Sequence, residues 1–135
     1  MYKNPLKEKL QRGVPVSGCM IQACMPSIVE ICGLAGFDFV FLDAEHGTIA
    51  PKDCEELVRA AEVRRTVPLI RVPNSESDTI LHFLDVGGMG IILPGVSTKE
   101  EVQRAVRAVK YYPQGKRGLN AVRASDSGMT KPLPD

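Results

Sequence analysis

The sequence predicts an α/β fold of the (β/α)8 TIM-barrel type, with residues 1–135 forming one domain that covers about the first four β–α units. Apolar strand-like runs alternate with helix-like segments from residue 16 to residue 109, which implies parallel strands joined by right-handed crossovers. Each strand-like run ends in a polar or turn cluster, as at the mouth of a barrel. A small doubly wound sheet is the alternative, although such a sheet usually concentrates its site at one switch point.

The first two units follow this pattern closely. A short apolar strand at Val16–Ile21 comes first, and Pro26 opens a helix that Gly36 ends. Residues 39–42 form an apolar run, which is typical of a strand buried on both faces. An amphipathic helix is predicted over Lys52–Arg65.

The third and fourth units repeat the alternation. Val67–Val72 is predicted as a strand, with Arg71 close to its C-terminal end. Residues 75–78 provide cap chemistry for the helix that follows. Gly90–Leu93 is the fourth strand, and a capping box at Thr98–Glu101 starts the helix after it.

The alternation ends after this helix. Residues 114–135 are rich in Gly, Ser, Arg and Pro and hold no clear fifth strand. This composition predicts a long functional loop with one short helix near residues 121–125.

Composition and charge exclude several classes of function. Hydrophobic residues make up 44% and charged residues 24% of the chain, and the net charge is +1, so neither nucleic acid nor a membrane surface is favoured as a partner. The sequence contains no apolar run of transmembrane length and no recognisable leader. The four cysteines match no zinc spacing and suit a reducing compartment. We therefore expect a cytoplasmic protein.

Three ionisable residues, Asp43, Glu45 and His46, directly follow the second strand. Removing these charges from water is costly unless the side chains bind a partner or take part in a reaction. In parallel α/β folds, chemistry occurs at this end of a strand. The alternation of Asp43 and Glu45 predicts that both carboxylates point the same way and share a cation, which could be a metal ion, Arg71 or a protonated His46. Histidine suits acid–base work, and arginine suits a carboxylate or an oxyanion. A purely structural carboxylate–arginine pair is the other interpretation.

Two further features are weaker candidates. Asp85 lies in the last turn of a predicted helix, where the dipole disfavours an anion, so it needs a partner cation or full solvation. Arg117 and Gly118 follow Lys116 in a loop that could bind an anionic substrate or be a plain turn. His82 is interpreted as a surface residue. The glycine-rich segments match neither a dinucleotide fingerprint nor a P-loop.

Taken together, these motifs resemble those of the HpcH/HpaI aldolase family, the divalent-metal-dependent pyruvate aldolases. The resemblance covers nearly the whole chain, and its motifs occur in the family's order. They are Phe37–His46, Pro68–Pro73, Leu84–Gly87, Tyr112–Gly118 and Arg123–Ser125.

The resemblance implies a barrel enzyme that cleaves or forms a carbon–carbon bond in 4-hydroxy-2-oxo acids, with pyruvate as the shared product. A divalent metal (Mg, Mn or Co) would act as a Lewis acid in the complete enzyme. By motif position, Arg71 would stabilise negative charge on the keto oxygen. His46, supported by Asp85, would move the proton at the aldol hydroxyl.

The same resemblance implies supporting roles and partners. Asp43 and Glu45 would hold the arginine and the water shell of the metal, while Arg117 and Gly118 would lie around the substrate. The expected partners are a small 2-oxo acid and an aldehyde, and the expected assembly is a homo-oligomer.

Two departures from the family pattern bear on activity. Met20 stands where the family commonly has a tryptophan near the pyruvate site. The family's direct metal ligands, a Glu on strand five and an Asp on strand six, would lie beyond Asp135, so no metal ligand is expected in this chain. Three hypotheses follow: an aldolase represented by an incomplete sequence, a catalytically incomplete half-barrel remnant or assembly module, and a citryl- or malyl-CoA lyase-like enzyme of the same superfamily. The 135-residue chain alone is expected to be inactive.

Overall fold

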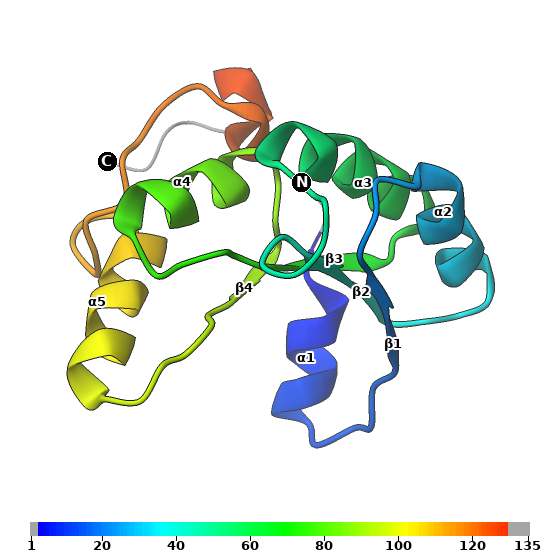
Figure 1. The fold of residues 1–135 in the computed structure, drawn as a ribbon, viewed down its shortest axis with the longest axis horizontal. Helices are drawn as coiled ribbons and strands as arrows, with labels where there is room; N and C mark the ends of the chain where they lie inside the picture. Colours follow the sequence, from blue (N-terminus) through cyan, green and yellow to red (C-terminus); the bar gives the residue numbers. More distant parts are fainter. Residues whose placement is uncertain (1–2, 130–135) are drawn as a thin grey trace.

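The computed structural model describes residues 3–129, in which strands and helices alternate along the chain (Figure 1). One helix precedes the alternation and one 3-10 helix follows it. The elements in chain order are α1 (Pro5–Gln11), β1 (Gly18–Ile21), α2 (Pro26–Leu34), β2 (Phe39–Asp43), α3 (Pro51–Arg64), β3 (Val67–Arg71), α4 (Ser77–Asp85), β4 (Gly90–Ile92), α5 (Lys99–Val109) and η1 (Arg123–Gly128).

The strands form one parallel sheet in the order β1-β2-β3-β4. Neighbours in the sheet are therefore neighbours in the chain, as in the wall of a (β/α)8 barrel, whereas a doubly wound sheet reverses its order at a switch point. The predicted barrel-type β–α units are confirmed. The register places Asp43 opposite Arg71 at the C-terminal ends of β2 and β3, so two predicted site residues lie side by side.

The main core lies between the sheet and the helices on one of its faces. Helices α2, α3 and α4 lie on this side, and α1 lies on the other (Figure 1). Val40 and Leu42 of β2 are fully buried together with Leu57 of α3. Phe39 and Phe41 of the same strand are only half-buried. The prediction that this strand is buried on both faces is therefore wrong for the described chain, because helices cover only one face of the sheet closely.

Local start signals account for most of the helices. Prolines open α1, α2 and α3. The predicted capping box of α5 is confirmed, because Glu101 N–H donates to Thr98 Oγ1 (3.3 Å) and Thr98 N–H donates to Glu101 Oε2 (2.9 Å). At α4 the N-cap is Glu76, which in the described chain makes no side-chain bond to the first turn. The cap predicted from residues 75–78 is therefore wrong.

The sequence patterns do not predict helix α1, although its start signal is present. Asn4 Oδ1 accepts a hydrogen bond from Lys7 N–H (3.1 Å), and Pro5 occupies the first turn. The helix buries only Leu6. Seven residues with one buried side chain are too few to show an apolar period.

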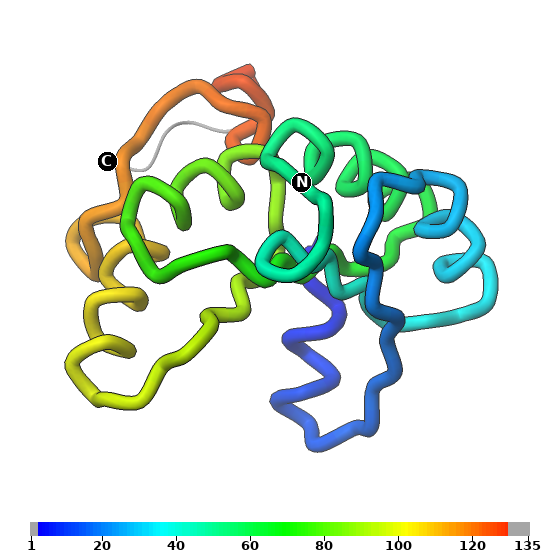
Figure 2. The backbone as a smooth tube through the Cα atoms, in the orientation of Figure 1, coloured from blue at the N-terminus to red at the C-terminus, as the bar shows by residue number. Residues whose placement is uncertain are grey.

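The segment after α5 runs back over α4, and η1 contacts α4 (Figure 2). The predicted short helix at 121–125 is found two residues later, as the 3-10 helix of residues 123–128. Arg123 Nη1 anchors this segment by donating to Glu62 Oε1 (3.2 Å) and to the Val86 carbonyl (3.3 Å). The last six residues of the predicted loop-rich segment 114–135 lie outside the described residues. Among residues 3–129, no helix is both long and apolar enough to cross a membrane.

Candidate active site

Asp43 is the centre of the candidate active site. This last residue of β2 is fully buried. Its carboxylate accepts five hydrogen bonds, of which two come from Arg71, two from the backbone N–H groups of Glu45 and His46, and one from Gln22 Nε2 (3.2 Å). The Arg71 guanidinium, helped by the backbone N–H of His46, holds the pKa of the Asp43 carboxyl well below its usual range despite burial. Asp43 is therefore ionised at neutral pH.

Arg71 meets Asp43 through one edge of its guanidinium group. Nε donates to Oδ1 (3.0 Å) and Nη2 donates to Oδ2 (2.7 Å), which is a bidentate pair. The guanidinium also lies 5.3 Å from the centre of the Phe41 ring. Nη1 has no hydrogen-bond partner among the residues that the structure describes, and the side chain is 23% exposed. Arg71 is thus held in a fixed orientation with one donor group left for an anionic atom.

Glu45 and His46 lie in the turn after β2. Because the strand ends at Asp43, the predicted alternation of the two acids along a strand is wrong. Both carboxylates nevertheless meet one cation, since Glu45 Oε2 lies 3.2 Å from Arg71 Nε. His46 Nε2 lies 3.6 Å from Glu45 Oε1, and the imidazole is 68% exposed. The structure therefore brings four predicted residues together and shows that Arg71 is the cation that the acids share.

Backbone contacts hold this turn against the strands on both sides. Ala44 N–H donates to the Arg71 carbonyl (2.9 Å), and Thr48 N–H donates to the Gln22 carbonyl (3.0 Å). A Cβ atom at Gly47 would lie 2.2 Å from the Asp43 carbonyl oxygen and 2.7 Å from the Gln22 carbonyl oxygen. The close approach therefore requires glycine at this position.

Sequence reasoning missed Gln22 as a site residue. Its amide donates to Asp43 Oδ2 from the residue that directly follows β1. The available signal was its position, because a polar residue after the first strand faces the same sheet edge as Asp43 and Arg71. This signal is weak, because an isolated glutamine is a common surface residue.

Asp85 and Arg117 pair with each other, away from His46. Arg117 Nη2 donates to Asp85 Oδ1 (2.7 Å), and this cation offsets the unfavourable position of Asp85 at the helix end. The chain after α4 enters the sheet beside the start of β3, where Met89 N–H donates to the Pro68 carbonyl (3.0 Å). Helix α4 runs back along the strands, so it leaves Asp85 at the opposite end of the sheet from His46. Support of His46 by Asp85 is therefore not found within the described chain.

The described residues do not fit a complete metal site. Among residues 3–129, no group of three or more His, Cys, Asp or Glu side chains is placed to hold a metal ion. Both oxygens of Asp43 already accept hydrogen bonds from nitrogen donors. The site that this chain builds is an arginine held by carboxylates, with a histidine at its rim.

The fold and this site define the class of the protein. A parallel sheet in sequential order, with charged side chains at the C-terminal strand ends, is the architecture of (β/α)-barrel enzymes. The sequence model of the HpcH/HpaI aldolase/citrate lyase family matches residues 17–128, and the chain belongs to this family. The resemblance found in the sequence motifs is confirmed.

Curated relatives carry aldolase names. The chain is 34% identical over 126 residues to the hydroxypyruvate/pyruvate aldolase of Roseobacter denitrificans, a match that covers 93% of this chain and 49% of the relative. It is also 34% identical over 135 residues to the 5-keto-4-deoxy-D-glucarate aldolase of Salmonella paratyphi A, covering 98% of this chain and 52% of the relative. The chain therefore spans about half the length of these relatives.

Solved structures of the family share the fold. An HpcH/HpaI aldolase from Desulfitobacterium hafniense matches with a TM-score of 0.84 at 33% identity, over 96% of this chain and 49% of that one. The citrate synthase SbnG matches with a TM-score of 0.80 at 38% identity, over 85% of this chain and 47% of that one. The relatives matched in sequence and structure are thus named as aldolases and as a citrate synthase.

Proposed function

We propose that the protein is a divalent-metal-dependent aldolase that cleaves or forms 4-hydroxy-2-oxo acids, with pyruvate as the common product. Family membership and the aldolase names of its relatives support this class of reaction. The observation that carries the proposal is Arg71, which carboxylates hold at the C-terminal edge of the sheet with Nη1 free of partners among the described residues.

Arg71 would stabilise negative charge on the substrate. Cleavage of a 4-hydroxy-2-oxo acid between C3 and C4 leaves the electron pair on the pyruvate fragment, where it spreads onto the keto oxygen. A guanidinium whose direction is already fixed loses little freedom when that charge develops, so it acts on the transition state without reorganisation. Lysine would retain the charge but not the planar fork that Asp43 holds.

His46 would move the proton at the aldol hydroxyl. Cleavage requires the C4 hydroxyl to lose its proton as the aldehyde forms. The exposed imidazole, which lies beside the Glu45 carboxylate that also meets Arg71, can accept this proton. Glu45, between the two side chains, would orient them.

The metal requirement follows from the family and not from the contacts of this chain. A bound divalent ion supplies Lewis acidity toward the 2-oxo acid. The described residues do not form its site, so the roles given to Arg71 and His46 need no metal contact from residues 3–129.

Release of pyruvate from a 4-hydroxy-2-oxo acid by the full-length protein tests the proposal. Activity should require Mg²⁺, Mn²⁺ or Co²⁺ and disappear with EDTA. R71K should lower kcat/KM by about 10²-fold or more, whereas R59K, on the exposed face of α3, should not change it. H46A should lower kcat by about 10²–10⁴-fold, and H82A, another exposed histidine, should leave kcat unchanged.

Two results would count against the proposal. Absence of metal-dependent pyruvate release from a folded full-length protein would exclude the aldolase and leave a catalytically incomplete module or an enzyme with another class of substrate. Full activity of R71K or H46A would remove that residue from the mechanism.

The family's name, which includes citrate lyase, and the likeness to a citrate synthase favour a second candidate, a lyase that acts on citryl or malyl thioesters of CoA. The same protein would then release CoA-linked products from such thioesters and show no turnover of 4-hydroxy-2-oxo acids. Parallel assays with both substrate classes distinguish the two candidates.

A further inference from the structure

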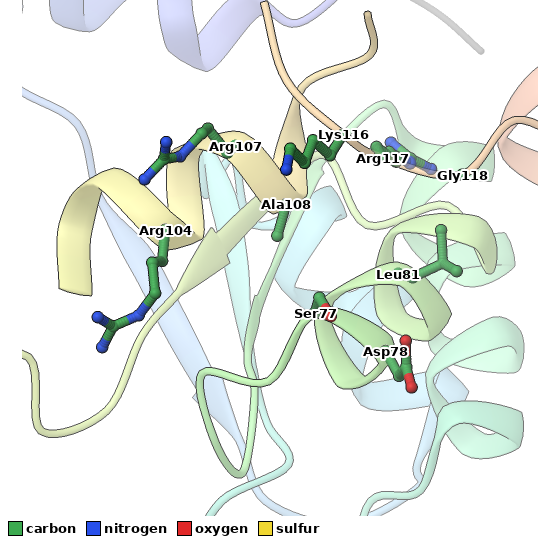
Figure 3. A pocket seen from close by; sticks show the side chains of 9 residues that line it. All are labelled: Ser77, Asp78, Leu81, Arg104, Arg107, Ala108, Lys116, Arg117 and Gly118. Atoms are coloured by element: carbon green, nitrogen blue, oxygen red, sulfur yellow. The ribbon is translucent and has the colours of Figure 1, made fainter. Parts of the chain in front are cut away.

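A cavity of about 540 Å³ lies between α4, α5 and the loop at residues 116–118, and none of the Asp43 site residues lines it. Figure 3 shows its three sides: α4 contributes Ser77, Asp78 and Leu81, and α5 and the loop contribute the remaining side chains. A volume of this size is in the range of small-molecule sites.

Positive charge dominates the lining of this cavity. Four cationic side chains and one carboxylate, that of Asp78, line it. The cations are Arg104, Arg107, Lys116 and Arg117. The first three make no ion pair with any residue in the described part of the chain. Lys116 and Arg107 are therefore available to a ligand, while Arg104 also interacts electrostatically with Glu101 of its own helix.

Arg117 has a mostly buried side chain, unlike the residues of an ordinary solvated basic surface. Its side chain is only 9% exposed, and its guanidinium lies 4.8 Å from the centre of the Tyr111 ring. Nη2 is paired with Asp85, but Nε is buried without a hydrogen-bond partner among the described residues. A buried donor of this kind is uncommon in native proteins, and it leaves the guanidinium of Arg117 only partly neutralised beside the cavity.

The N-terminal end of α4 adds to the positive potential. This helix has nine residues, and its first two, Ser77 and Asp78, line the cavity. No side chain in the described chain caps the helix, so the first backbone N–H groups are left to water or to a ligand. An uncapped helix start attracts anions through these groups and through the helix dipole.

We propose that this cavity binds the phosphate groups of a small phosphorylated molecule. Arginine forks, an ammonium group and a helix N-terminus are the donors that recognise phosphate oxygens. Leu81 and Ala108 give the cavity an apolar wall on which the organic part of such a molecule can lie. This site is separate from the Arg71 site and does not depend on the proposed aldolase activity.

Calorimetric titration with inorganic pyrophosphate and, separately, with ADP at constant ionic strength tests the proposal. Both probes should bind the wild-type protein, and K116Q should weaken binding by about fivefold or more. K99Q removes the same charge from the first residue of α5, outside the cavity, and should change affinity by less than about twofold. D78N removes the opposing carboxylate and should strengthen binding.

The two probes distinguish recognition of phosphate groups alone from recognition of phosphate groups attached to an organic molecule. Equal affinity for pyrophosphate and ADP would support an anion site that recognises phosphate alone. Tighter binding of ADP would support contact of the organic part with the apolar wall. The proposal is overturned if neither probe binds, or if K116Q and K99Q weaken binding equally, because the attraction is then unspecific. R104Q provides a second exposed variant, and it should behave like K116Q.

Discussion

Replacement of Asp43 with asparagine tests whether this carboxylate organises the Arg71 site. Asparagine has nearly the same shape as aspartate, but an NH₂ group replaces one of the two carboxylate oxygens. In the native protein, nitrogen donors approach both oxygens of Asp43. Arg71 Nη2 and Gln22 Nε2 donate to Oδ2, and Arg71 Nε donates to Oδ1. Either orientation of the new amide therefore sets a donor against a donor, and the charge that neutralises Arg71 is also lost.

The size of the effect follows from the burial of the pair. Removal of one partner from a fully buried ion pair costs about 3–5 kcal/mol. Arg71 is 23% exposed, and Glu45 remains 3.2 Å from Nε, so part of the charge stays compensated. We expect D43N to lower the free energy of unfolding by about 2–3 kcal/mol at pH 7.

Urea unfolding followed by circular dichroism measures this loss. The midpoint should fall by about 1–2 M with an unchanged m-value. E45Q, at the more exposed carboxylate, should cost less than about 1 kcal/mol. A D43N protein that unfolds within about 0.5 kcal/mol of wild type would refute the argument that this network holds the site.

The pH dependence of the same comparison provides a second check. Because folding lowers the pKa of Asp43, the stabilisation is complete above the unfolded-state pKa, near 4, and is lost as the pH falls toward the folded-state pKa. Each pH unit in that interval removes up to about 1.4 kcal/mol. The difference in stability between wild type and D43N should therefore be about 1 kcal/mol smaller at pH 3 than at pH 7.

Two further substitutions test the local structure by urea unfolding. G47A places a Cβ atom 2.2 Å from the Asp43 carbonyl oxygen, so it should cost about 2 kcal/mol or more, whereas G118A meets Leu81 at an ordinary 3.7 Å and should cost little. Equal losses in both would contradict the close approach at Gly47. T98A removes the acceptor for Glu101 N–H and should cost about 1 kcal/mol, while S97A, whose hydroxyl takes no part in the capping box, should be near neutral. A stable T98A would show that the capping box contributes nothing to α5.

Much of the fold was predictable because its signals are local. The apolar runs, the prolines and the capping box depend on residues close together in the chain, and β1 to β4 and α2 to α5 lie where those signals place them. The exposure of Phe39 and Phe41 was not predictable, because it depends on which elements cover the second face of the sheet.

The candidate site was predictable in part for the same reason. The pairing of Asp43 with Arg71 follows from two charged residues at the ends of consecutive parallel strands. Gln22 carried too weak a signal, since a polar residue after a strand is common. The implied partnership of His46 with Asp85 came from motif resemblance, which contains no information about which end of the sheet a helix terminus reaches.

The sequence by itself determined the order of the β–α units, the family, and the presence of charge at the C-terminal end of β2. These properties are determined by periodicity and residue type, which act over a few positions. Only the tertiary structure decided which polar groups meet beyond the Asp43–Arg71 pair. It brought Gln22 to Asp43 and Glu45 to Arg71, paired Asp85 with Arg117, and gathered cations from α5 and the loop into one cavity. The physical reason is that ion pairs and cavities depend on distances across the sheet and between helices, and these distances are established only when the core packs.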